Sequence, residues 1–415
     1  MAAASFVGTT IEFYDFFIYG TAAALVFPRL FFPMSGALSG TLLSFATFGV
    51  GFVARPLGGV LFGHYGDRIG RKKMLVLSLI VMGAATTLVG LLPTYATLGS
   101  FAAILLVTLR FLQGVAVGGE WGGAVLMAVE HSPSGRRGFY GSFPQLGAPV
   151  GTVLATGSFL LVALLPGPDF LAWGWRLPFL ASVILLGVGL FIRLSVAESP
   201  LFQQLAAQQR HARIPVVEVI RGHRRGVLLV AGAFLVQSAV AYIYVAYLAT
   251  YATTVAGASR TAILTVIILS GVVMAVAMLV SAVCSDRFGR KPVYLTGVVA
   301  MGVLVFPSIA LVNTGSFWPM LLGHVLVFGL AQGIASGPSG AMFAEAFPTR
   351  VRYSGISVGY QLASVGGAAL APIIAALLLE ATGSGYAIAG YLSALAVLSL
   401  IAVTRMRESS HATLD

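Results

Sequence analysis

The chain has little charge, since Asp, Glu, Lys and Arg together make up 9% of its 415 residues. Hydrophobic residues make up 58%, and the mean hydropathy is +0.96. A soluble core of this length does not need so much apolar surface. Stretches of 18 or more mostly apolar residues recur along the chain, which predicts membrane-spanning helices. The short alternating strands of a transmembrane β-barrel are absent, so the spans are expected to be helical.

Cysteine and lysine are also scarce. One cysteine, Cys284, excludes an internal disulfide and a multi-cysteine metal site. None of the three lysines follows a glycine, so no GxxxxGK occurs and ATP-driven pumping by this chain alone is not expected. No HExxH motif or nucleophile elbow supports a membrane-embedded enzyme, so we expect no enzymatic activity, no metal and no cofactor. No positive region precedes the first apolar stretch, so no cleavable signal peptide is predicted.

The apolar pattern predicts twelve spans, and their even number places both termini on one side of the membrane. Placing the termini inside puts 19 of the 24 Lys and Arg residues in inner loops and the tail, so both termini are predicted to be cytoplasmic. The net charge of +11 has this cause and does not indicate nucleic acid binding. The predicted spans run roughly over 5–27, 38–63, 74–93, 99–129, 138–165, 173–193, 227–254, 261–283, 292–312, 317–346, 354–380 and 385–404.

Four regions are predicted from these spans. They are a first six-helix bundle over 1–193, a cytoplasmic loop over 194–226, a second bundle over 227–405 and a short tail over 406–415. The extramembrane remainder leaves no room for a separate catalytic domain.

Two charged loops repeat at a fixed distance. The sequence GHYGDRIGRKK at 63–73 returns in weaker form at 282–291, with the two aspartates 219 positions apart. Gln113 and Gln332 keep the same offset. Two unrelated landmarks in one register predict a duplicated architecture with a substrate site between the halves, as in transporters. The alternative for one such loop is a cationic anchor that only fixes topology.

Ionisable residues inside the spans are costly and are functional candidates by default. Glu12 and Asp15 share one helical face. Arg110 is predicted near the midplane, where it needs a partner, and Asp15 is the expected one. If Arg110 turned to an anionic substrate, Asp15 would take up a proton, so Asp15, Glu12 and Glu120 are the candidate proton-coupling residues. The alternative is a structural ion pair, and Glu12 and Glu120 are also consistent with positions near the cytoplasmic interface.

Polar and aromatic residues in other spans are candidates for lining a cavity. Each lone Gln or Tyr could instead be an interhelical hydrogen-bond partner. The candidate substrate-binding residues are Arg110, Tyr14, Tyr19, Gln113, Gln145, Gln237, Tyr242, Gln332, Tyr360 and Gln361.

Four stretches carry a family resemblance: EFYDFFIYG, RPLGGVLFGHYGDRIGRKK, RFLQGVAVGGEWGGA and WGWRLPF. The charged loop and its echo SDRFGRK resemble the loop signature of the major facilitator superfamily. The combination resembles the metabolite:proton symporters, which carry shikimate, α-ketoglutarate, citrate, aromatic acids and proline or betaine, and AALVFPRLFFP is most similar to the shikimate branch. The implied fold is an all-α integral membrane protein with twelve transmembrane helices in two pseudo-symmetric six-helix bundles.

The resemblance implies proton-coupled symport of a small carboxylic acid such as shikimate by alternating access, in a bacterial inner membrane and as a monomer. Protons are the expected coupling ion. The charged loops would form a cytoplasmic gate that clamps the outward-open state. The implied gate residues are Asp67, Arg71, Glu130 and Arg136 or Arg137 in the first half, and Asp286, Arg290, Glu345, Arg350 and Arg352 in the second.

Two alternatives stay open: uptake of a zwitterionic osmolyte such as proline or betaine, and a sensor without flux. The tail MRESSHATLD is too short for an osmosensing coiled coil, which counts against the osmolyte. Few residues precede the first predicted span, so we expect a truncated or alternatively started chain. The stretch GAPVG in the fifth span departs from drug antiporters because it lacks their Gly-Pro pair.

Overall fold

The computed structural model describes residues 2–69, 71–118, 125, 128–129, 132–133, 135–195, 219, 221–348 and 352–408. These residues are almost entirely helical and contain no strand. Twelve long helical segments coincide with the twelve predicted spans, so the predicted helix order is confirmed. Ten of the described helices are long and apolar enough to cross a membrane by length and composition.

The long helices of the first half contain no π-helical segment among the described residues. These long helices are α1 (Ala2–Leu25), α3 (Ala37–Ile69), α4 (Arg71–Leu91), α6 (Ser100–Val117), α8 (Arg137–Ala163) and α10 (Leu177–Ser195). The short segments are α2 (Phe27–Leu30), α5 (Tyr95–Leu98), α9 (Gly167–Ala172) and the 3-10 turn η1 (Gly174–Arg176).

The second half differs because three of its spans contain a π-helical segment, a feature that often marks functional sites. These spans are α13 (Arg224–Tyr242), η2 (Ile243–Tyr247) and α14 (Leu248–Thr254); α17 (Phe317–His324), η3 (Val325–Ala331) and α18 (Gln332–Ala344); and α19 (Arg352–Ala363), η4 (Ser364–Ala369) and α20 (Ala371–Thr382). The unbroken spans are α15 (Arg260–Phe288), α16 (Arg290–Val312) and α21 (Gly385–Arg405).

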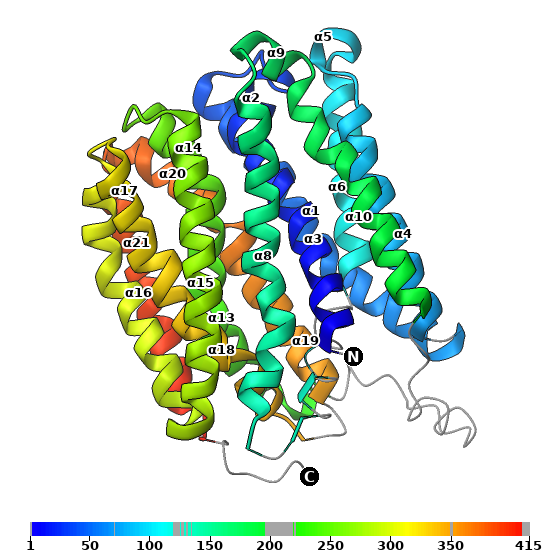
Figure 1. Ribbon diagram of the computed structural model, residues 1–415, viewed down its shortest axis with the longest axis vertical. Coiled ribbons are helices and arrows are strands. Elements are labelled where there is room, and N and C mark those ends of the chain that lie inside the picture. The colour runs from blue at the N-terminus through cyan, green and yellow to red at the C-terminus, as the bar shows by residue number, and fades with distance from the viewer. Residues whose placement is uncertain are drawn as a thin grey trace.

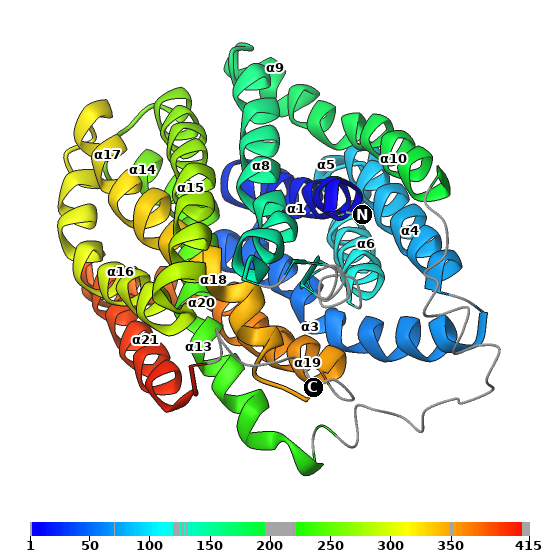
Figure 2. The same ribbon diagram turned by 60° about the horizontal axis from the view of Figure 1, so that its bottom comes forward.

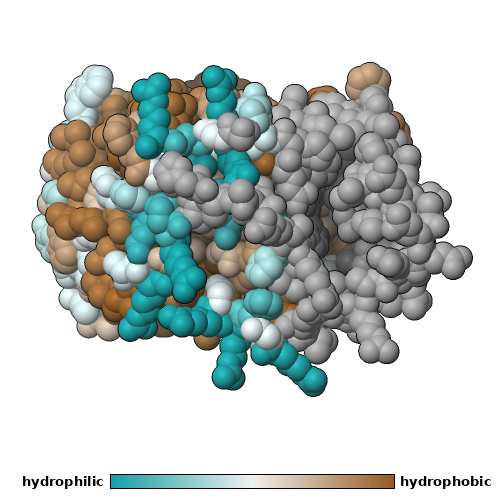
Figure 3. Space-filling model, turned by 90° about the horizontal axis from the view of Figure 1, so that it is seen from below, coloured by the Kyte–Doolittle hydropathy of each residue, from teal (hydrophilic) through white to brown (hydrophobic). Residues whose placement is uncertain are grey.

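The two halves stand side by side, and α8 of the first half lies against α15 of the second (Figure 1). The start of α1 and the end of α21 lie at the same end of the molecule, as the even number of spans predicts (Figure 1). The view in Figure 2 brings this end forward. We call it the terminal end and the other the distal end. Seen from the terminal end, hydrophilic residues gather in a band beside an apolar area (Figure 3).

Large apolar side chains cover the outer surface of the helices. Ile184, Phe191 and Trp318 expose 71%, 73% and 75% of their surface. In water such a surface would drive association, whereas in a bilayer it faces the lipid chains. The polar side chains that the helices bury are thereby kept away from the lipid, either inside one half or at the contact between the halves.

Glycines bring α3 and α6 into close contact. A Cβ at Gly58 or Gly114 would overlap the backbone of the facing helix, and a Cβ at Gly51 would lie 2.6 Å from Arg110 Nε. Small residues allow this approach between helices in lipid. The approach seats the Arg110 side chain directly against α3.

Candidate functional site

A small cavity lies where the two halves meet. Its volume is about 50 Å³, far below the roughly 300 Å³ of a typical ligand pocket. A ring-sized ligand therefore enters only when the halves move apart. Its lining residues are Phe13, Phe17, Gln145, Ala148, Thr152, Phe234, Gln237, Ser238, Ala241, Tyr242, Met274, Met278, Phe328, Gln332, Ser336 and Tyr360.

The halves touch at both ends of this cavity. At the terminal end, Gln361 Nε2 donates to the Gly118 carbonyl at 3.3 Å. At the distal end, Thr250 Oγ1 donates to the Ala24 carbonyl at 3.1 Å, and the Arg260 guanidinium lies 4.1 Å from the Phe170 ring. The structure is therefore a closed arrangement in which the cavity lies between two sets of contacts.

Five of the ten predicted substrate-binding residues line the cavity: Gln145, Gln237, Tyr242, Gln332 and Tyr360. Their amides and hydroxyls form a neutral polar wall opposite apolar residues such as Met274. No charged residue occurs among the lining residues that the structure describes. The cavity itself thus offers hydrogen bonds and apolar contact, and any charge on a ligand must be met by a residue outside the lining.

Two buried arginines lie behind an aromatic layer next to the cavity. The guanidinium carbons of Arg55 and Arg110 each lie 4.1 Å from the centroid of the Phe16 ring. Arg110 also lies 4.9 Å from the Phe48 ring, and Phe48 contacts Tyr242 of the cavity wall at 5.5 Å between centroids. Arg110 is 0% exposed, so the rings take the place of water around its charge.

The predicted direct ion pair between Asp15 and Arg110 is wrong for this arrangement. Among the described residues no ion pair within 4.0 Å joins them, because Arg110 lies over aromatic rings. Arg55 pairs with Glu12 at 3.6 Å, so another predicted proton-coupling residue, and not Asp15, takes part in an ion pair.

Asp15 and Arg110 are connected through two polar side chains. Arg110 Nη1 donates to Gln113 Oε1 at 3.1 Å, and Gln113 Nε2 donates to Thr86 Oγ1 at 2.7 Å. Thr86 Oγ1 donates to Asp15 Oδ2 at 3.0 Å, and Ser182 Oγ donates to Asp15 Oδ1 at 2.9 Å. Thr86 Oγ1 also lies 2.9 Å from the Met82 carbonyl, so its single proton can go to either acceptor, and the hydroxyls of Thr86 and Ser182 are the groups that can stabilise an ionised Asp15. The Asp15 side chain is 1% exposed, so protons reach it only when the structure opens.

The other predicted substrate-binding residues lie outside the cavity lining. Tyr14 donates to the Pro178 carbonyl at 2.8 Å, inside the first half. Tyr19 donates to Thr47 Oγ1 at 3.0 Å and stands 4.3 Å from the Arg110 guanidinium. The Gln361 side-chain amide donates to the Gly118 carbonyl across the contact between the halves. These residues build the surroundings of the charged cluster or the contact between halves.

At the terminal end, Asp286 of the second half accepts hydrogen bonds from the first residues of α8. The donors are the backbone N–H groups of Gly138 at 2.9 Å and Phe139 at 3.0 Å. Arg290 Nη1 lies 2.6 Å from the same carboxylate. A carboxylate at a helix N-terminus is stabilised by the helix dipole and the unpaired N–H groups. Asp286 therefore joins the halves while paired within its own half.

The second-half group of predicted gate residues is partly assembled. Arg290 Nε lies 3.8 Å from Glu345, as expected, whereas Arg352 Nε donates to the Phe347 carbonyl at 3.1 Å. Arg136 is exposed just before α8. Glu120, Glu130, Arg350 and the side chains of Asp67 and Arg71 lie outside the described residues.

The sequence did not predict several residues of the site, because their residue types are common at such positions. Thr86 and Ser182 complete the relay to Asp15, but hydroxyls are common in membrane helices. The Glu408 carboxylate accepts hydrogen bonds from the backbone N–H groups of Arg290 and Lys291 at 3.0 and 2.9 Å. It thereby links the segment after α21 to the start of α16. The signal available for Glu408 was its position as an acid directly after the last span.

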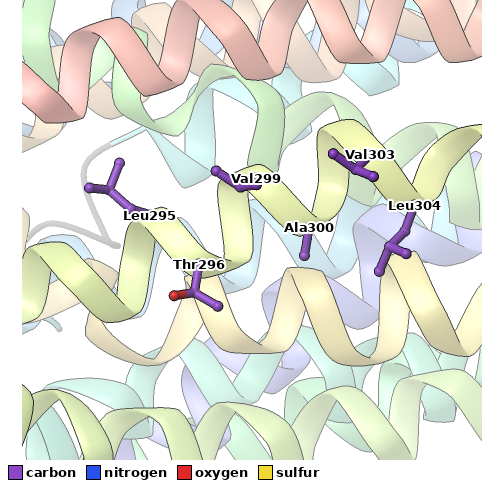
Figure 4. A pocket seen from close by; sticks show the side chains of 6 residues that line it. All are labelled: Leu295, Thr296, Val299, Ala300, Val303 and Leu304. Atoms are coloured by element: carbon purple, nitrogen blue, oxygen red, sulfur yellow. The ribbon is translucent and has the colours of Figure 1, made fainter.

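A larger groove of about 560 Å³ runs along α16, and Figure 4 shows its lining. Its residues are apolar except for Thr296, whose hydroxyl donates to the Pro292 carbonyl of its own helix. Val299 and Val303 are exposed on the outer surface. The groove belongs to the lipid-facing surface and offers no convergent polar groups.

Comparison with known proteins agrees with this architecture. The chain matches the sugar (and other) transporter family over residues 1–216 and 207–415. It is 44% identical over 419 residues to the inner membrane metabolite transport protein YhjE of Escherichia coli, covering 99% of this chain and 94% of that protein. It is 41% identical over 415 residues to the shikimate transporter of the same organism, with 99% and 95% covered.

A solved structure shares the fold. The crystal structure of a D-xylose-proton symporter superposes with a TM-score of 0.77 at 20% identity, covering 100% of this chain and 99% of the other. The twelve-helix fold and the family resemblance predicted from the sequence are thereby confirmed. This chain belongs to the sugar (and other) transporter family of the major facilitator superfamily and is an integral membrane transporter, not an enzyme.

Proposed function

We propose that this transporter is a proton-coupled symporter that carries a small organic acid across a bacterial inner membrane by alternating access. The observation that carries the proposal is the buried relay from Arg110 to Asp15, which lies beside a cavity that both halves line. The relay places one carboxylate and one cation in the same closed network, where the state of each affects the other. The shikimate transporter among its relatives supports an organic acid as the substrate.

Arg110 is the proposed partner of the substrate carboxylate. Its Nη2 atom is buried and makes no hydrogen bond among the described residues. Tyr242 and Phe48 separate it from the cavity, so a shift of these rings would open the path. A guanidinium binds a carboxylate through two parallel hydrogen bonds, which a lone amide of the cavity wall does not provide.

Binding and protonation are coupled through the relay. When Arg110 turns to the substrate, Gln113 loses its hydrogen bond from Nη1 and Asp15 loses its nearest link to a cation. A buried carboxylate without a counter-charge favours the protonated form. Substrate and proton therefore load together and leave together. Glu12, paired with Arg55, is the proposed second proton carrier, and Glu120 is the other predicted one.

The charge distribution supports cytoplasmic termini, and we propose a monomer with bundles over 1–193 and 227–405 joined by a cytoplasmic loop. The charged loops are proposed to latch the terminal end through Asp286 and, by the sequence repeat, through Asp67.

The test is uptake by purified protein in liposomes with an imposed pH difference. Screened compounds are shikimate, α-ketoglutarate, citrate, protocatechuate, proline and betaine. A monoanion carried with one proton moves no net charge, so each pH unit is expected to sustain about a tenfold gradient. An uncoupler should abolish the gradient. Uptake of betaine alone would favour the osmolyte alternative, and no pH-driven uptake of any compound would reject the proposal.

A further inference from the structure

Gln332, the first residue of α18, lines the cavity and is 3% exposed. Its Nε2 atom donates to the main-chain carbonyl of Gln237 at 3.0 Å. A carbonyl oxygen only accepts hydrogen bonds, so the amide cannot flip without setting oxygen against oxygen. The contact therefore fixes which end of the Gln332 amide is the acceptor. That acceptor, Oε1, receives no hydrogen bond within the described part of the chain.

Each of two neighbouring amides of the cavity wall directs one of its two N–H donors to a serine hydroxyl. Gln237 Nε2 donates to Ser336 Oγ, and Gln237 Oε1 accepts from the Tyr294 hydroxyl at 3.2 Å. Gln145 Nε2 donates to Ser339 Oγ at 2.9 Å. Both N–H bonds run to serine hydroxyls, and Gln332 Oε1 receives no hydrogen bond among the described residues, so it is a buried acceptor on a residue that lines the cavity. A buried acceptor left unpaired is costly, which favours a ligand that brings a donor.

We propose that Gln332 determines specificity by accepting a hydrogen bond from a hydroxyl group of the substrate. The inference rests on the proposed function and deepens it, because it narrows the substrate class to hydroxylated carboxylic acids. The carboxylate is met by Arg110, outside the lining, and a hydroxyl is met by Gln332, inside it. An acid without a donor, or a quaternary ammonium compound, leaves Oε1 unpaired in the bound complex and is discriminated against.

The experiment compares two compounds with the same ring and the same carboxylate. These are shikimate, which carries ring hydroxyls, and cyclohex-1-ene-1-carboxylate, which carries none. In pH-driven liposome uptake, the wild-type protein is expected to prefer shikimate in kcat/KM by at least about tenfold, the factor for one hydrogen bond left unmade. Gln332→Met keeps the length of the side chain and removes the acceptor. In Gln332→Met, kcat/KM for shikimate is expected to fall about tenfold, whereas kcat/KM for cyclohex-1-ene-1-carboxylate is expected to stay unchanged.

Ser399→Ala supplies the matched control. Ser399 lies on α21, outside the cavity lining, and bonds the same helix α13 through the Gly232 carbonyl at 2.7 Å. It tests whether general loosening of α13 alters the preference, and the preference should stay as in the wild type. Equal uptake of the two compounds by the wild type, or an unchanged preference in Gln332→Met, would overturn the inference and leave the proposed function standing. No pH-driven uptake of either compound would also overturn the inference, and the proposed function would then be rejected only if none of the six screened compounds is taken up.

Discussion

The first half of the transporter buries charge in mid-span, whereas the second half buries amides beside π-helical segments. Glu12, Asp15, Arg55 and Arg110 are all at most 2% exposed and lie on α1, α3 and α6. In the second half, the buried cations Arg290 and Arg352 stand at the starts of helices at the terminal end. The two halves have the same helix order but differ in the kind of polar side chain that they bury in the middle of their spans.

The difference indicates a division of roles. Unbroken helices hold the charged cluster of the first half in fixed positions, since each of its members is fixed by hydrogen bonds or ring contacts. The π-helical segments η2, η3 and η4 interrupt three spans of the second half, two of them next to cavity residues Tyr242 and Gln332. We therefore expect coupling to reside in the first half and bending to reside in the second.

Removing the central cation of the first half should have the largest effect. Arg110→Ala is expected to weaken substrate binding about a hundredfold, because the carboxylate loses its buried counter-charge. Arg110→Lys should recover only part of the loss, since an ammonium lacks the planar fork of the guanidinium. Isothermal titration of the purified protein measures both.

Arg176→Ala is the control for Arg110. Arg176 is a first-half arginine that bonds the carbonyls of Gly90 and Leu92 away from the charged cluster. Its loss should leave binding unchanged. Wild-type affinity in Arg110→Ala would show that the cation does not bind the substrate.

Weakening the contact between the halves should have a smaller effect. Asp286→Asn keeps the shape but removes the charge that faces the N-terminus of α8. We expect uptake about five- to tenfold slower with substrate affinity unchanged, because the substitution shifts the balance between states and not the site. Asp67→Asn, its first-half counterpart in the repeat, should act in the same direction.

Initial uptake rates measure the change in transport, and binding measurements show whether the substrate affinity is unchanged. Glu380→Gln removes an exposed carboxylate from α20 and should change neither. Normal rates in Asp286→Asn and Asp67→Asn would reduce the charged loops to topological anchors.

The smallest expected effect concerns the helices themselves. Amide hydrogen exchange in detergent should be about threefold faster in η2 and η3 than in the middle of α8, because π-helical segments are less regular and open more readily. Mass spectrometry of peptides that cover Ile243–Tyr247 and Val325–Ala331 measures this. Equal protection in both halves would remove the proposed difference in bending.

Much of the fold could be predicted because bilayer thickness fixes span length and lipid forbids unpaired backbone groups. The helical segments therefore follow the hydropathy pattern closely. The aromatic layer and the π-helical segments could not be predicted. Both depend on contacts between distant helices, such as Phe48 with Tyr242.

The candidate site was predictable in part. Buried ionisable residues stand out in an apolar chain, so Asp15 and Arg110 were identified. Their connection was not, since nothing local distinguishes Thr86 from other threonines of the spans. Charge alone predicted a direct pair, whereas aromatic rings can also hold a buried guanidinium.

The most direct test of coupling in the first half is Asp15→Asn in liposomes, measured in two ways. Asparagine keeps the shape of the side chain and one acceptor oxygen, its NH2 group donates where the second carboxylate oxygen accepts, and it can neither take up nor release a proton. The account predicts that pH-driven accumulation is lost while exchange between preloaded compartments continues, because exchange needs no net proton movement. Accumulation of substrate against a gradient by Asp15→Asn under the same pH difference would contradict it.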